Sequence, residues 1–426
     1  MKPRIQIIGG RVIDPANQLD RDCSLYLAEG RVIALDQAPD GFTADQTIDA
    51  TDCWVIPGLI DLRAALREPG QEHKATIASE LHAAAAAGIT SLCATPDSTP
   101  IADTEAVIEL IHQRAGAVGS TRVYPLGAAT QGLAGEQLTE MASLASSGCI
   151  GFFDSHGATN NTLTRWRMMQ YAASHDLLLY LHPWDQSLVA GGCMHDGAVS
   201  ARLGLPGIPV EAELIGLQRD ITLAQRSGAR LHFCGISSAQ GAALLHTALR
   251  ENSNLSADVS AHQLHLTEAH CEQFSSLFRV DPPLRTATDR EALRQAVADG
   301  TLTAICSDHQ PHDPEAKLHP FSTAEPGISA LETLLPLVLA LIGEQLSPTT
   351  AIAAVTTGPA QVLGINAGHL SPQAVADLCI VDPNLRWTPA QDGWMSQGLN
   401  TPFFDTELQG RATHTLIGGE IIAQLK

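Results

Sequence analysis

Acidic and histidine residues stand directly after several short apolar runs of this 426-residue chain. Asp154, His182 and Asp308 each follow such a run. If the runs are strands of one parallel barrel, their C-terminal ends meet at one face, where barrel enzymes place their chemistry. Taken singly, each residue is more often structural, because an aspartate at a strand end commonly caps the next helix. Taken together, two carboxylates and an imidazole are typical of a zinc site.

Apolar runs and helix-like segments alternate between residues 56 and 367, which predicts right-handed βαβ units around a parallel sheet. About eight such units favour a (β/α)8 barrel over an open sheet. The predicted strands lie near residues 55–62, 89–94, 123–126, 149–153, 177–181, 230–234, 255–259 and 304–307.

Both ends of the chain have a sequence pattern that predicts β-strands without intervening helices. Short β-like runs separated by glycine pairs fill residues 1–55, and β texture returns in 368–426, where Gly418-Gly419 predicts a hairpin. We therefore expect an α/β fold with two domains. Its parts are the barrel of 56–367 and a small β domain built from 1–55 and 368–426.

The composition restricts the partners of the protein. The chain has 25 basic and 46 acidic residues, a formal net charge of −21 at pH 7. This sign opposes both nucleic-acid backbones and anionic membrane surfaces, so we expect neither as a partner. The nine cysteines are scattered and form no C-x-x-C pair. Such a set is typical of reduced thiols and predicts a cytoplasmic protein.

Residues 55–62 (Val-Ile-Pro-Gly-Leu-Ile-Asp-Leu) and 66–70 (Leu-Arg-Glu-Pro-Gly) resemble the barrel-opening segment of the class I dihydroorotases in the amidohydrolase superfamily. The similarity covers almost the whole chain. It implies an amidohydrolase-type TIM barrel with a small β domain built from both chain ends. Further matches lie at 207–213, 281–285, 289–290, 307–312, 327–333, 376–378 and 400–403.

Three metal-binding histidines of that family are replaced here. By the resemblance, the family's His-x-His corresponds to Arg63 and Ala65, and its histidine on the sixth strand corresponds to Gly235. None of the three offers a lone pair to a metal. His232, three positions earlier, points to the opposite face of its strand and does not replace the lost ligand. The resemblance leaves Asp154, His182 and Asp308 as residual ligand positions, with Asp308 also the family's general base.

Two substrate positions carry added negative charge. By the resemblance, Asp97 and Asp281 stand where the family has asparagine. Dihydroorotate and carbamoyl-aspartate are anions, so both carboxylates oppose their binding. Arg67 and His312, which the resemblance places at the carboxylate of the substrate, are kept.

We therefore expect a non-catalytic, dihydroorotase-like protein with no metal and no cofactor. The resemblance also implies a partner, because some bacteria carry an inactive dihydroorotase homologue that assembles with aspartate carbamoyltransferase in pyrimidine biosynthesis. That transferase needs the homologue for its activity or stability. By this resemblance, the chain forms a homodimer within a larger hetero-oligomer with the catalytic chains of the transferase.

Two other functions stay open. One is an active metal-dependent cyclic amidohydrolase, of the dihydroorotase or hydantoinase type, with a single zinc ion held by Asp154, His182 and Asp308. Three protein ligands and a water are sufficient for a catalytic zinc site. The other is a small-molecule sensor that uses the old pocket without turnover.

Electrostatics predicts what fills the vacant metal position. Without a cation, Asp154 and Asp308 would bring two negative charges into one barrel mouth, which requires a raised pKa or a positive partner. Arg63 carries a permanent charge on a planar group suited to carboxylates. We therefore predict a salt bridge from Arg63 to Asp154 or Asp308.

Overall fold

The computed structural model describes residues 2–154, 161–189, 191–343 and 345–425. Eight parallel strands lie side by side in sequence order. A parallel bridge from Ala64 to His309 and a hydrogen bond from Ala65 N to His309 O, at 2.8 Å, close the last strand onto the first. The predicted (β/α)8 barrel is therefore confirmed. Its strands are β8 (Leu59–Ala64), β9 (Ile89–Ala94), β10 (Arg122–Ala128), β11 (Gly151–Asp154), β12 (Leu178–Leu181), β15 (Arg230–Phe233), β16 (Leu255–Ser260) and β17 (Ala304–Cys306).

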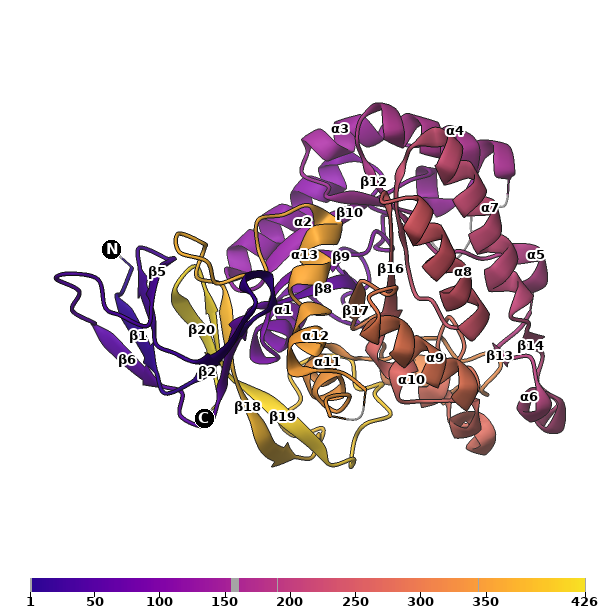
Figure 1. The fold of residues 1–426 in the computed structure, drawn as a ribbon. Helices are drawn as coiled ribbons and strands as arrows, with labels where there is room; N and C mark the ends of the chain where they lie inside the picture. The colour runs from indigo at the N-terminus through magenta and orange to yellow at the C-terminus, as the bar shows by residue number, and fades with distance from the viewer. Residues whose placement is uncertain (1, 155–160, 190, 344, 426) are drawn as a thin grey trace.

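Helices surround this barrel (Figure 1). In the described ranges no helix is long and apolar enough to cross a membrane. The longer helices are α1 (Ile77–Ala86), α2 (Glu105–Val118), α4 (Thr162–Ser174), α7 (Glu211–Ser227), α8 (Ala239–Glu251), α9 (Ala287–Ala298) and α11 (Leu331–Leu339). The shorter ones are α3 (Met141–Ser146), α5 (Gln186–Val189), α6 (Ala198–Leu203), α10 (Pro314–Leu318), α12 (Pro348–Ala353) and α13 (Thr357–Leu363). A two-stranded sheet of β13 (Met194–His195) and β14 (Gly207–Ile208) lies in the connection before α7.

Capping residues determine where the strand-end loops stop and the helices begin. Thr76 accepts from Ser79 N at the start of α1, and Ser238 accepts from Gly241 N at the start of α8. Thr286 accepts from Asp289 N at the start of α9. Each cap satisfies an amide that the first helical turn leaves unpaired. These caps anchor the C-terminal ends of the loops that carry Arg67, Gly235 and Asp281.

The small β domain contains segments from both ends of the chain, as predicted. Strand β7 of the N-terminal part pairs with β2 in parallel and with β18 of the C-terminal part in antiparallel register. The hairpin at Gly418-Gly419 is present between β19 and β20. One sheet has the order β5-β4-β1-β6 and the other the order β20-β19-β18-β7-β2-β3. The strands are β1 (Ile5–Ile8), β2 (Arg11–Asp14), β3 (Leu19–Asp22), β4 (Leu25–Ala28), β5 (Arg31–Leu35), β6 (Gln46–Asp49), β7 (Trp54–Pro57), β18 (Leu378–Trp387), β19 (Leu408–Ile417) and β20 (Glu420–Gln424).

Candidate functional site

A buried ion pair stands in the barrel mouth, at the C-terminal ends of β8, β16 and β17. Arg63 Nε lies 3.1 Å from Asp308 Oδ1, and the two side chains are 7% and 3% exposed. Ser260 Oγ accepts from Arg63 Nη2 at 3.2 Å and donates to Asp308 Oδ2 at 3.1 Å. Gln310 Nε2 also donates to Asp308 Oδ1, at 3.2 Å. The predicted salt bridge from Arg63 to Asp154 or Asp308 is therefore confirmed, with Asp308 as the partner, and donors surround the carboxylate of Asp308.

A second buried carboxylate lies one layer deeper in the barrel, on β16. Asp258 Oδ1 is 3.9 Å from Arg63 Nη2 and accepts from Gly235 N at 2.7 Å. Its Oδ2 is 3.0 Å from His232 Nε2. Burial raises the pKa of Asp258, but Arg63, His232 and the Gly235 amide together hold it below its ordinary value. His232 thus points into the barrel, toward the Arg63–Asp258 cluster that a side chain at Gly235 would also face. The prediction that it points to the opposite face was wrong, because the left-handed backbone of Gly235 interrupts the alternation of the strand.

The glycine at 235 makes room for Arg63. A Cβ atom at this position would lie 3.1 Å from Arg63 Nη2 and 3.2 Å from Nη1, closer than ordinary van der Waals contact. The backbone of Gly235 is also left-handed, with φ of +65°, which favours glycine. Two of the three departures from the family pattern, at 63 and 235, are therefore structurally coupled.

Asp154 is held by a second arginine. Arg165 of α4 places Nη2 2.9 Å from Asp154 Oδ2 and Nη1 3.3 Å from Asp220 Oδ2 of α7, and all three side chains are fully buried. The sequence analysis did not identify Arg165. Nothing in the sequence separates it from Arg167, two positions later on the same helix and solvent-exposed. Only the packing of α4 against the barrel shows which arginine points inward.

Within the described ranges, the structure does not bring the three residual ligand positions together as one group of potential metal ligands. In the described ranges, one group of three potential ligands has its donor atoms within 4.8 Å of one another, namely His232, Cys234 and Asp258. The Arg63 cation lies beside Asp258 of this group, which opposes a second cation there. Burial also raises the pKa of the Cys234 thiol well above its ordinary value. The expected set of Asp154, His182 and Asp308 is not such a group. His182 is buried, with its ring 4.7 Å from that of Trp184.

Arg67 and Asp97 form another ion pair at the mouth. Arg67 Nη1 lies 3.1 Å from Asp97 Oδ2, and Nη2 lies 3.4 Å from His312 Nε2. The two residues that the resemblance assigns to substrate carboxylate therefore lie together, and the partly exposed Asp97 contacts one of them, Arg67. Asp281 is partly buried and, within the described ranges, is not among the residues that line the cavity of the mouth.

That cavity is small. It measures about 30 Å³ and is lined by Arg63, Ala65, Thr95, Asp97, Phe153, Asp308, His309 and Gln310. Sites for small organic ligands measure about 300–1,000 Å³. The cavity lined by these residues is therefore too small for a cyclic amide.

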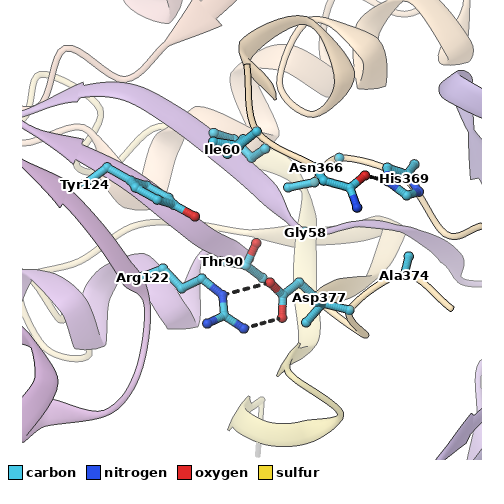
Figure 2. Close-up of a pocket in the computed structure, with 13 residues that line it drawn as sticks. Gly58, Ile60, Thr90, Arg122, Tyr124, Asn366, His369, Ala374 and Asp377 are labelled. Atoms are coloured by element: carbon cyan, nitrogen blue, oxygen red, sulfur yellow. Dashed lines mark hydrogen bonds and ion pairs between the residues drawn. The ribbon is translucent and has the colours of Figure 1, made fainter. Parts of the chain in front are cut away.

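A larger cavity, of about 250 Å³, lies at the opposite end of the barrel, where the strands begin (Figure 2). Its wall includes a bidentate ion pair that joins β10 to the small β domain. Arg122 Nε and Nη2 donate to the carboxylate of Asp377 at 2.9 and 3.1 Å. The open space of this barrel end is therefore remote from the face where barrel enzymes carry out chemistry.

His309, directly after Asp308, has a structural role. Its Nε2 lies 2.7 Å from Glu80 Oε2 and its Nδ1 accepts from Ala330 N at 3.0 Å. Glu80 also accepts from Ser396 Oγ at 2.6 Å. This buried network connects the end of β17 to α1 and to the C-terminal part of the chain, and it fixes the backbone that carries Asp308.

Known proteins resemble the chain over its whole length. It matches the Dihydro-orotase-like family model over residues 53–241 and the Amidohydrolase family model over 257–423. A Dihydroorotase-like protein of Pseudomonas putida is 46% identical over 98% of both chains. One of Pseudomonas aeruginosa is 44% identical over 98% of this chain and 99% of its own.

Another relative in sequence is named a dihydroorotase, and a solved structure resembles the chain in fold only. A Dihydroorotase of Anaeromyxobacter dehalogenans is 40% identical over 98% of this chain and 97% of its own. The structure of L-hydantoinase (dihydropyrimidinase) from Arthrobacter aurescens covers 100% of this chain and 96% of its own, with a TM-score of 0.88 at 21% identity. The latter is a likeness of fold.

Proposed function

The chain belongs to the dihydroorotase-like family of amidohydrolases, and we propose that it is a non-catalytic member of that family with a structural role. The proposed role is support of aspartate carbamoyltransferase in pyrimidine biosynthesis, in a cytoplasmic assembly of the two proteins. Within it, this chain forms a homodimer and contacts the catalytic chains of the transferase.

The observation that carries the proposal is the pairing of both residual acidic ligands with arginines. Arg63 holds Asp308 and Arg165 holds Asp154, at 3.1 and 2.9 Å. Hydrolysis of a cyclic amide in this family needs a metal that polarises the carbonyl and produces hydroxide near neutral pH. A metal ion bound by Asp154 and Asp308 would have to displace two buried guanidinium groups. Each carboxylate would then only exchange its arginine for the metal.

The proposed partner comes from the family resemblance, and two properties of the chain agree with it. The barrel and its closing β domain are complete, as expected when the folded surface is what matters. Only 17% of the residues are charged, against about 25% in ordinary soluble proteins. A low charged fraction leaves room for the large, mostly uncharged interfaces of obligate complexes, which bury more than about 2,000 Å².

The proposal is tested by co-expression with a carbamoyltransferase catalytic chain from the same genome. We expect a stable mixed assembly in size-exclusion chromatography, active transferase and no dihydroorotase turnover. Separate elution of the two chains would contradict the structural role. Dihydroorotase turnover with about one zinc ion per chain would instead favour the mononuclear amidohydrolase.

A further inference from the structure

The cavity at the base of the barrel, which we call the base cavity, measures about 250 Å³. It lies between the N-terminal parts of β8, β9 and β10 and residues 365–377, which connect α13 to β18 (Figure 2). Ile60 and Tyr124 line it from the barrel, and Asn366 and Ala374 from the connecting segment. Its volume is just below the roughly 300–1,000 Å³ of sites for drug-sized ligands. The base cavity therefore suits a molecule with one small ring.

The charges in the wall of the base cavity compensate one another. Arg122 Nε and Nη2 donate to the two carboxylate oxygens of Asp377 at 2.9 and 3.1 Å. Asp377 Oδ1 also accepts from Gly418 N, at 2.6 Å. A charged ligand would lose hydration on entering without gaining an uncompensated opposite charge, which is costly. The wall therefore favours a neutral molecule.

The connecting segment orients an amide at the base cavity. His369 Nε2 donates to Asn366 Oδ1 at 2.8 Å, and His369 Nδ1 accepts from Ser371 N at 3.4 Å. Because one ring nitrogen donates and the other accepts, these bonds fit a neutral imidazole. They also engage the oxygen of the Asn366 amide, which leaves the Nδ2 hydrogens as donors to a ligand.

Tyr124 provides a polar group on the barrel side of the base cavity. Figure 2 shows its hydroxyl directed toward the middle of the cavity, across from Asn366. Burial raises the pKa of Tyr124, so the phenol is neutral near neutral pH. The remaining wall includes the aliphatic side chains of Ile60, Ile365 and Val375. Polar groups on two sides and apolar walls between them suit an amphipathic ring compound.

We propose that the base cavity binds a small, neutral ring compound with a polar substituent. The substituent accepts from Asn366 Nδ2, and the ring packs between Tyr124 and the aliphatic wall. Such a ligand contacts both the barrel and the segment that leads into the small β domain, so it connects the two parts. The inference does not rest on the proposed function, because the base cavity shares no lining residue with the cavity of the mouth.

The probe is nicotinamide, which is neutral near neutral pH and carries a carboxamide on a single six-membered ring. Nicotinate is the matched reference, because it has the same ring with a carboxylate in place of the carboxamide. Binding to the full chain is measured by calorimetric titration. We expect nicotinamide to reach half-saturation at about 1 mM or below, as for a small ligand of ordinary efficiency. Nicotinate should bind at least about tenfold more weakly.

Two variants locate the binding. Asn366→Asp keeps an acceptor for His369 but replaces the donor nitrogen with an oxygen, so nicotinamide should bind roughly tenfold or more weakly. Tyr124→Phe keeps the ring and should weaken binding by about 2- to 10-fold. Gln361→Glu is the control, because it adds the same negative charge to an exposed position of α13 that does not line the base cavity. Its affinity should equal that of wild type.

Three results would overturn the inference. They are the absence of saturable nicotinamide binding in the millimolar range, equal affinity for nicotinate, and wild-type affinity in every folded variant of Asn366 and Tyr124. A loss in Gln361→Glu as large as that in Asn366→Asp would also overturn it, because a general charge effect would then explain both. If one of the two site variants does not fold, the other makes the same test.

Discussion

Replacing Arg63 with methionine keeps most of the side-chain length and removes the charge at the centre of the barrel mouth. Arg63 lies 3.1 Å from Asp308 and 3.9 Å from Asp258, and these carboxylates are 3% and 0% exposed. Removing one partner of a buried ion pair leaves an uncompensated charge, at a cost of about 3–5 kcal/mol. We therefore expect Arg63→Met to lose roughly that much free energy of unfolding near neutral pH.

The loss should shrink in acid. In the wild type, burial raises the pKa of Asp258, but Arg63, His232 and the Gly235 amide lower it by more. A carboxyl with a lowered folded-state pKa adds stability above its unfolded pKa of about 3.9, and this stability is lost as the pH falls through the folded pKa. Without Arg63, the effect of burial on Asp258 prevails, so Asp258 takes up a proton at higher pH. Once Asp258 is protonated, the Arg63→Met variant no longer contains an unpaired buried charge, so its loss of unfolding free energy relative to wild type becomes smaller.

The assay is urea unfolding followed by tryptophan fluorescence at about pH 8, 6.5 and 5, where the linkage is expected. Arg386→Met is the control, because Arg386 and its partner Glu407 are 68% and 61% exposed. Such surface pairs contribute about 0–1 kcal/mol. A variant Arg63→Met within about 1 kcal/mol of wild type at pH 8, or a deficit that grows on acidification, would refute the reasoning.

Three further predictions concern the same mouth. Gly235→Ala should lower the free energy of unfolding by about 1–2 kcal/mol because of its left-handed backbone, and further because of the contact with Arg63. In an Arg63→Met background, urea unfolding should show a smaller loss. Equal losses in both backgrounds would contradict the coupling of positions 63 and 235. Purified wild-type protein should contain no stoichiometric divalent metal by elemental analysis, and one or two zinc ions retained through gel filtration would contradict this. The triple change Arg63→His, Ala65→His and Gly235→His should recover zinc binding, but only weakly, because a histidine at 235 would need a left-handed backbone. Its turnover should stay far below that of a working dihydroorotase, because Asp97 still opposes anions. Near-normal turnover would show that metal loss alone silenced the chain.

Sequence reasoning predicted features that depend on order and periodicity. The alternation of strands and helices predicted the barrel, and the β texture of both ends predicted one composite domain. A salt bridge from Arg63 to Asp154 or Asp308 also followed, because strand ends of one barrel meet and opposite charges in a buried space pair. That Asp308 is the partner comes from the structure.

Features that depend on packing did not follow from the sequence. Arg165 reaches Asp154 only because α4 and α7 pack together and place Asp220 beside it. Asp97 was interpreted as a charge that repels an anionic substrate, whereas the structure pairs it with Arg67. Both need the direction in which a side chain leaves its helix or loop, which residue type and spacing do not specify.

Transferase activity in cells that lack this chain tests the central claim most directly. The account predicts that carbamoyltransferase activity falls or becomes unstable without the chain. It should return when the wild-type chain is supplied, and equally with the folded variant His182→Ala, whose altered residue belongs to the site that we propose to be non-catalytic. Full transferase activity without the chain, or its loss with folded His182→Ala alone, would contradict the account.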